Sequence, residues 1–331
     1  MKTKSFPYRI CTALSATALL LASCEREVNF DGQLPDAKIV INCFVEADSL
    51  ISAYVSRSWN LSEDGPRALT DADVSLHVND ALQPPMQPVD SLPGQNSGYS
   101  HVGQTYLSRS VAREGDRIRI TVRKDGYPEA SAETVVPGKA VILSIDTTRF
   151  KEQYASDAMR FLIRFSDLHA GERDYYRLVV THQYSYDSVA RTGAVVFNYG
   201  QDAALNEGFR DATGGALDTE GENRYGIFTD DLFDGREYTL NIHFRPRYSG
   251  EDSGEYMWDS ETGELISFGR ITYSRYIFRL VTLSPSAYQY LKTRTHYGGD
   301  VFTEPSAIYT NITGGLGIMG SFQTDEKEIE N

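Results

Sequence analysis

The chain has 331 residues, 40% of them hydrophobic, and a formal net charge of −14 at pH 7. This length is enough for one large domain or for two domains of ordinary size. The acidic balance argues against nucleic-acid binding, which rests on basic side chains that neutralise phosphates. The same charge is repelled by an anionic membrane surface, so electrostatic attraction alone would not hold the chain there.

The first 23 residues have the three-part pattern of a secretion signal. The first nine include Lys2, Lys4 and Arg9 and no acid, and the next twelve are almost entirely apolar or small. This apolar stretch is shorter than the roughly 20 residues that a membrane-spanning helix needs. We therefore predict that residues 1–23 are a signal peptide, and its removal would leave a net charge of −17.

The predicted signal ends in Leu21-Ala22-Ser23-Cys24. This sequence resembles the bacterial lipobox, in which the cysteine thiol is diacylated and the peptide is cut just before it. The alternative is an ordinary signal with a cysteine nearby by chance. We predict that acylated Cys24 anchors the chain in membrane lipid, because several acyl chains together hold a protein stably. The polar residues 24–37 would be a tether, and the expected location is the outer membrane, on its periplasmic or its extracellular face.

The three cysteines are Cys11, Cys24 and Cys43. With Cys11 in the signal and Cys24 acylated, Cys43 is left alone, so we expect neither an intramolecular disulfide nor a cysteine-rich zinc site. Because Cys43 lies in the apolar run Ile39–Val45, we interpret it as a small buried hydrophobe on a strand, with a catalytic thiol as the alternative.

Beyond the tether, strand-like runs separated by turn residues predict an all-β fold. The alternation of apolar and polar residues over Ile118–Arg123 is typical of a half-buried antiparallel strand. Asp125-Gly126 and Asp234-Gly235 are dipeptides typical of hairpin turns. The predicted strands are Lys38–Glu46, Ile51–Arg57, Asp73–Val78, Asp116–Arg123, Ala132–Val136, Arg160–Phe165, Tyr175–Tyr186, Arg236–Arg245 and Arg270–Leu283.

One short helix is predicted near the C-terminus. Ser284 and Pro285 provide a cap and a helix-opening proline, residues 287–292 continue the helix, and Gly298-Gly299 marks its far end.

The chain is predicted to form two β-sandwich-like domains that meet near Val136-Pro137-Gly138. The short strands of residues 38–138 fit an immunoglobulin-like or transthyretin-like sandwich. Residues 139–331 would form a larger β domain with long acidic loops, which often carry the contacts of a binding protein.

Residues Gly315–Gly320 match the dinucleotide-binding pattern G-x-G-x-x-G. That function needs a helix after the glycines and an acid about 20 residues further on. The glycines are followed instead by the charged run Asp325–Glu328, which we interpret as a tail. We therefore expect glycines of a closing strand or bulge, and no cofactor.

The segment Tyr248–Glu264 combines six acidic residues with aromatic ones. Its rings Tyr248, Tyr256 and Trp258 are the candidate ligand-contact residues, since sugars and peptides stack on such rings; the alternative is that they pack the loop against the body. Calcium takes six to eight oxygen ligands, several of which this segment could supply. It lacks the order of a known calcium loop, so no metal site is predicted.

The predicted strand Tyr175–Tyr186 places six side chains on one face, which we interpret as core, with a binding face as the alternative. They are Tyr176, Leu178, Val180, His182, Tyr184 and Tyr186. The six histidines of the chain are scattered, and none is paired at the spacing of a helical zinc site. We expect His182 and His243 to be packed or hydrogen-bonded within strands. No catalytic residue is predicted.

Several segments resemble the Bacteroidota lipoprotein family named domain of unknown function 4249 (DUF 4249). The resemblance implies a β-rich outer-membrane lipoprotein, often encoded beside TonB-dependent receptors, with no established activity and no catalytic residue to transfer. The segments are Cys24–Val28, Lys38–Asn42, Val55–Ser58, Asp71–Leu76, Asp230–Tyr238, Leu283–Leu291, Glu304-Pro305 and Tyr309–Ile318.

These observations favour a non-enzymatic lipoprotein that serves as an accessory binding or assembly partner of a TonB-dependent receptor in nutrient uptake. The first alternative is a structural or adhesive cell-surface lipoprotein. The second is a hydrolase whose site the sequence does not display.

Overall fold

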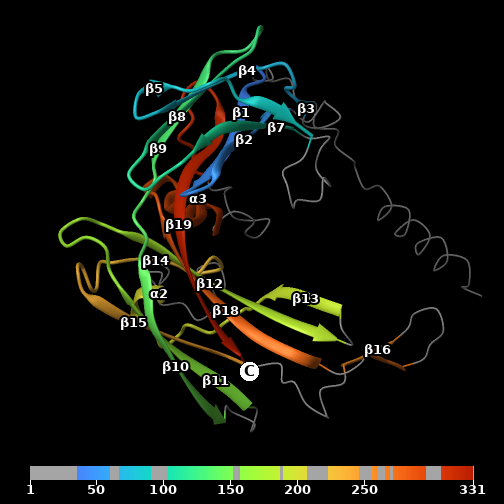
Figure 1. The fold of residues 1–331 in the computed structure, drawn as a ribbon, viewed down its shortest axis with the longest axis vertical. Coiled ribbons are helices and arrows are strands. Elements are labelled where there is room, and N and C mark those ends of the chain that lie inside the picture. Colours follow the sequence, from blue (N-terminus) through green and yellow to red (C-terminus); the bar gives the residue numbers. More distant parts are fainter. Residues whose placement is uncertain are drawn as a thin grey trace, which may run out of the picture. The chain divides into compact units, whose positions relative to one another are not determined.

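The computed structural model describes most of the chain beyond the predicted tether, and from Ala37 onward the described residues belong to one compact unit (Figure 1). The predicted signal peptide and lipobox lie outside the described residues. Among the described residues, no helix has the length and apolar content needed to span a bilayer. The described stretches are 36–59, 67–90, 103–151, 157–186, 189–206, 223–245, 255–258, 265–268, 271–295 and 307–330.

The largest sheet has ten strands, in the order β13-β12-β18-β19-β1-β2-β7-β6, with β14 paired to β12 and β3 paired to β2. Its strands are β1 (Ile39–Glu46), β2 (Leu50–Arg57), β3 (Arg67–Ala68), β6 (Gln87–Val89), β7 (Gln104–Val111), β12 (Tyr175–Tyr186), β13 (Val189–Ala194), β14 (Ile227–Thr229), β18 (Ile271–Leu283) and β19 (Leu316–Glu330).

Three smaller sheets and two helices complete the described fold. The first sheet contains β4 (Asp73–Val78), β5 (Ala81–Leu82), β8 (Arg117–Arg123) and β9 (Ala130–Val135). The second contains β10 (Val141–Lys151), β11 (Asp157–Ser166) and β15 (Glu237–Phe244), and the third β16 (Glu255–Trp258) and β17 (Leu265–Phe268). The helices are α2 (Ala203–Asn206) and α3 (Pro285–Thr295).

The first core lies between one part of the large sheet and the sheet β5-β4-β8-β9. Strand β1 alternates buried and more exposed positions, so Ile39 and Ile41 point into this core. From the opposite sheet, β8 contributes Ile118 and Ile120 to the same cluster. Each sheet thus buries one face, which is the arrangement of a β-sandwich.

The second core is aromatic and lies between β12 and β18 of the large sheet and the sheet β10-β11-β15. The rings of Phe161 and Phe244 stack with centroids 4.6 Å apart, and Phe165 meets Tyr176 edge-on at 5.4 Å. Large rings suit this space because each buries much apolar area and interlocks with its neighbours. The prediction of an all-β, sandwich-like fold with a short C-terminal helix is confirmed.

Strand β19 borders strands of both cores, as Figure 1 shows. Its first half pairs with β1 in parallel, and its second half pairs with β18 in antiparallel orientation. Gly317 makes the close approach to β1 possible. It has φ of +105°, and a Cβ atom there would lie 2.1 Å from the carbonyl oxygen of Ile41. Gly317 and Gly320 of the false dinucleotide pattern therefore belong to a strand, as expected, and Gly315 directly precedes it.

Helix α3 packs on β19 through a shared serine. The Ser284 hydroxyl caps the helix by accepting a bond from the Ala287 backbone N–H (3.4 Å), and it also accepts the Ser321 backbone N–H (2.9 Å). A Cβ atom on Gly320 would lie 2.9 Å from that of Ala287, so glycine lets the helix lie close to the strand.

Two expectations about turns and ends are wrong. Asp234-Gly235 forms a turn with φ of +70° at the glycine, but not a hairpin, because β14 pairs with β12 whereas β15 pairs with β11. The charged run Asp325–Glu328 is not a tail, because it continues β19, where Glu326 pairs with Arg279 of β18 at 2.7 Å.

The segment predicted as a domain boundary, Val136-Pro137-Gly138, connects β9 to β10. The division into residues 38–138 and 139–331 stays a prediction. The structure adds that β19, from the end of the chain, pairs with β1 from its beginning.

Gly317→Ala should lower the free energy of unfolding by about 2–4 kcal/mol, because it places a Cβ atom against the backbone of β1 in a left-handed conformation. Chemical denaturation would measure the loss. Gly193→Ala is the matched control, because a Cβ atom at this position of β13 would meet nothing within 4 Å. An equal effect of both substitutions would contradict the described contact between β1 and β19.

Candidate functional site

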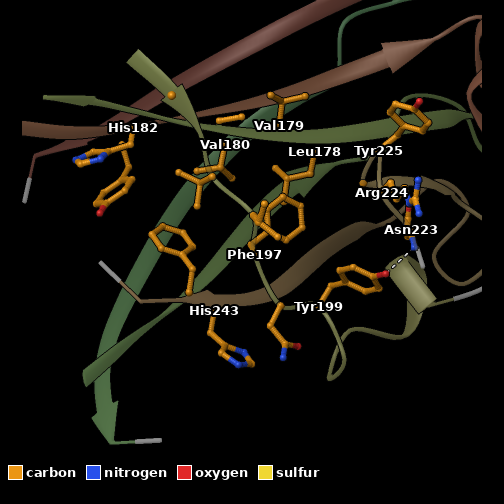
Figure 2. Close-up of a pocket in the computed structure, with 18 of the residues that line it drawn as sticks. Leu178, Val179, Val180, His182, Phe197, Tyr199, Asn223, Arg224, Tyr225 and His243 are labelled. Atoms are coloured by element: carbon orange, nitrogen blue, oxygen red, sulfur yellow. Dashed lines mark hydrogen bonds between the residues drawn. The ribbon is translucent and has the colours of Figure 1, made fainter. Parts of the chain in front are cut away.

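A groove of about 1170 Å³ opens beside β12, and Figure 2 shows the residues that line it. Its lining comes from β12, from residues 193–200 at and after the end of β13, from residues 223–226 before β14, and from the end of β15. Segments far apart in the sequence meet here because β12 pairs with β13, β14 and β18.

Strand β12 supplies the floor of the groove with Leu178 and Val180, whose side chains are buried. They lie opposite Leu280 and Phe278 of β18 in the register of the two strands, which places the four residues on one face of the sheet. The face of β12 predicted as core is thus confirmed at these positions, and it also forms the bottom of the groove.

His182 lies further along the same face and is buried between two rings. Its centroid is 4.8 Å from that of Tyr184 and 4.6 Å from that of Tyr276, both in stacked orientation. Its Nε2 atom is 2.7 Å from the hydroxyl oxygen of Ser274. The expectation of a packed, hydrogen-bonded histidine is confirmed, and the three rings give one end of the groove an aromatic surface.

The wall beside the floor carries Phe197 and Tyr199, two half-buried rings that pack against the second core and whose centroids are 6.3 Å apart. Gly226 allows Phe197 to approach β12, since a Cβ atom there would lie 2.5 Å from the Leu178 carbonyl oxygen and 3.2 Å from the Phe197 ring. Beside these rings, the Val196 side chain is 93% exposed, an unusual position for a large apolar group.

Buried hydrogen bonds hold this wall in place. The Asn223 backbone N–H donates to the Tyr199 hydroxyl at 2.6 Å, drawn as a dashed line in Figure 2. The Asn223 side chain donates to the carbonyl oxygens of Leu205 in α2 and Ile227 in β14. On the other side, Asn198 and His243 exchange backbone hydrogen bonds of 2.7 and 2.9 Å.

The described lining residues differ in charge from the chain as a whole. None of them is aspartate or glutamate, although the net charge of the chain is −14. Arg177, Arg224 and Arg245 lie in the lining. The Arg177 Nε donates to the Tyr225 carbonyl oxygen at 2.9 Å, and burial lowers the pKa of Arg177 from its ordinary value. Arginine remains protonated at neutral pH, so these side chains place positive charge along the lining.

None of the sequence-predicted site residues is among the described residues that line this groove. Cys24, the lipobox and Tyr248 lie outside the described residues. Tyr256 and Trp258 belong to β16, which pairs with β17, but their side chains lie outside the described part. The groove residues had one signal in the sequence, a large apolar or aromatic residue at every second position over Val195–Tyr199 between turn-rich segments.

Cys43, the possible catalytic thiol, is a core residue. It lies in β1 with 1% of its surface exposed, and burial raises its pKa to about 12. A nucleophilic cysteine needs an accessible thiolate, which this environment disfavours. The interpretation of Cys43 as a small buried hydrophobe is confirmed.

The model of one protein family, described as domain of unknown function (DUF4249), matches residues 25–328. The match covers the tether, both cores, the groove and nearly all of β19. No curated protein matches the chain at a significant level.

We expect the Cys43 thiol to resist modification in the native protein, because at pH 8 a pKa near 12 leaves only about one molecule in ten thousand as thiolate. The chain from Glu25 to Asn331 has Cys43 as its one cysteine, so a colorimetric thiol assay reports on it alone. One thiol should react promptly in denaturant and essentially none in native buffer. Rapid reaction of the folded protein would show that Cys43 is accessible.

Proposed function

The chain belongs to the family of domains of unknown function 4249, and from this membership and the groove we propose that it is an outer-membrane-anchored lipoprotein with a non-enzymatic role. It binds a nutrient ligand and serves as an accessory binding or assembly partner of a TonB-dependent uptake system. Cys24, at the end of the Leu21-Ala22-Ser23 lipobox pattern, carries the acyl chains that anchor it.

The groove is the observation that carries the binding role. Pockets for small ligands usually have volumes of roughly 300–1000 Å³ and combine apolar walls with a few placed polar groups. At about 1170 Å³ this groove can accept a ligand of several linked units. The rings of Phe197, Tyr199 and Tyr225 offer stacking surfaces, and the arginines offer charge. A sugar or peptide that bears carboxylates matches both properties.

The tether supports the uptake role because it places a binding domain at the membrane. A ligand held at this surface is concentrated near a receptor in the same membrane, since tethering replaces free diffusion with a high effective concentration. Family membership alone fixes no activity, so the partner and the ligand each need a direct test.

A membrane pull-down of tagged protein from its native host tests the partner. We expect a TonB-dependent receptor to co-purify with the anchored protein and to be lost with the unacylated variant Cys24→Ala, because without lipid the protein no longer stays at the membrane. Mass spectrometry of the captured proteins is the measurement. If the anchored form captures no receptor, the accessory role fails, and loss of cell attachment on deletion of the gene would favour the adhesive alternative.

Isothermal titration with a panel of uncharged and carboxylate-bearing oligosaccharides and peptides tests the groove. Carboxylate-bearing ligands should bind most tightly, and Arg224→Glu should weaken their binding by about tenfold, because it replaces an attractive charge with a repulsive one. Arg119→Glu makes the same charge change at an exposed position of β8 in the other core. An equal effect of the two variants would place binding outside the groove.

A further inference from the structure

Three aspartates meet where strands of the second core end. Asp167 follows β11, Asp174 precedes β12, and Asp230 follows β14. One carboxylate oxygen of each lies within 4.8 Å of those of the other two. The strand pairing explains the encounter: Tyr175 lies opposite Thr229 in the register of β12 and β14, so the next residues outward, Asp174 and Asp230, are also neighbours.

Asp230 is the most deeply buried of the three aspartates. It is 2% exposed, and its Oδ2 atom is buried with no hydrogen-bond partner among the described residues. A buried carboxylate oxygen without a partner is costly, because it has lost its water. Backbone hydrogen bonds from Asp174 and Asp230 to the same carboxylate offset only part of this cost. The burial of Asp230, with the charges of Asp167 and Asp174 as further contributions, raises its pKa above the ordinary value.

The other two carboxylates are fixed in position. Asp167 accepts hydrogen bonds from the Tyr176 hydroxyl at 2.5 Å and from the Gly235 backbone N–H at 2.6 Å. Asp174 accepts the His169 backbone N–H at 3.0 Å, and His169 Nδ1 lies 3.2 Å from its oxygens. Each carboxylate oxygen can take two interactions, so these bonds orient the groups and leave capacity for a further partner.

The neighbouring cation does not neutralise the cluster. Arg173 lies next to Asp174 in sequence, but its guanidinium pairs at 2.5 Å with Asp231, which is not one of the three aspartates. His169 pairs with Asp174 at 3.2 Å, and this hydrogen bond, with the charges of Asp174 and Asp167 as further contributions, raises the pKa of His169. Among the described residues, a single histidine thus faces three carboxylates.

A bound cation that prefers oxygen ligands would balance the negative charge of the three carboxylates. Three carboxylates are hard oxygen ligands, whereas structural zinc sites use mainly cysteine and histidine. Calcium–oxygen distances of 2.3–2.6 Å put opposite ligands of one ion roughly 5 Å apart, and magnesium requires a tighter arrangement. The three carboxylate oxygens lie within 4.8 Å of one another, so all three can reach one calcium ion.

We infer that Asp167, Asp174 and Asp230 bind a calcium ion that ties together the ends of β11, β12 and β14. Backbone carbonyls or water would supply its remaining ligands. Asp174 immediately precedes β12, and Asp230 immediately follows β14, so the ion would also stiffen the strand that forms the floor of the groove. This inference does not rest on the proposed uptake role.

Calcium titration of the chelator-treated mature protein tests the site. We expect one equivalent to bind, with a rise in melting temperature, and Asp230→Asn to weaken binding at least tenfold. Asp231→Asn is the matched control, because it makes the same change at the next residue, which lies outside the cluster and pairs with Arg173. Should Asp230→Asn fail to fold by circular dichroism, Asp174→Asn serves in its place.

Terbium luminescence locates the bound ion. The Tyr176 hydroxyl is hydrogen-bonded to Asp167, so excitation of tyrosine should sensitise a terbium ion in the cluster, and added calcium should quench the emission by competition. Tyr176→Phe should remove most of the emission.

Three results would overturn the inference. The first is the absence of heat and of any melting shift up to about 5 mM calcium, beyond the roughly millimolar range of weak extracellular sites. The second is equal binding by the Asp230→Asn and Asp231→Asn variants, which would place the ion elsewhere. The third is a wild-type protein that binds no calcium, together with an Asp230→Asn variant that is as stable as this wild type. That result would show that a proton holds the cluster together.

Discussion

Two sets of hydrogen bonds hold β19 at the centre of the fold. Its main chain pairs with β1 along one half and with β18 along the other. Its alternate side chains from Ser321 onward bond to the segment that leads from β9 into β10. These bonds join Ser321 to Val135 (2.6 Å), Gln323 to Pro137 (2.6 Å), Asp325 to the Ile142 N–H (2.8 Å) and Lys327 to Leu143 (2.6 Å). The last strand therefore fixes the connection between the two smaller sheets that cover the cores.

The groove and the aspartate cluster both follow from this arrangement. Because the connecting segment is fixed, β10 and β11 lie over β12 and β18 and close the aromatic core. Strands that share a core must end near one another, so the loops after β11 and β14 meet the start of β12. The groove forms further along β12, beside the segment 193–200. Among the described residues, carboxylates are therefore gathered at these strand ends and are not found in the groove lining.

Local pattern predicted much of the fold, because burial on one face imposes a period of two on a strand. The predicted strands at 73–78 and 175–186 have the observed bounds, and helix α3 begins at Pro285 as its cap indicates. The charged end of β19 was misjudged because its residues are paired through the main chain and with arginines of β18, contacts that depend on residues about 50 positions away. The strands β7, β10 and β13 were not predicted; most of the positions of β10 are exposed or half-buried, so its alternation is weak.

Sequence reasoning could not assemble the aspartate cluster, since Asp230 lies far from Asp167 and Asp174 in the chain and no ligand spacing links them. Yet two of the segments that carried the family resemblance do lie at structural contacts. Asp230–Tyr238 contains a cluster residue and Gly235, which bonds Asp167, and Asn311 in Tyr309–Ile318 bonds both backbone groups of Met319 in β19. The groove residues Phe197 and Arg224 lie in none of these segments. Because exposed lining residues such as Arg224 take no part in the described contacts of β19, their substitution can alter ligand preference while β19 and its partners stay unchanged.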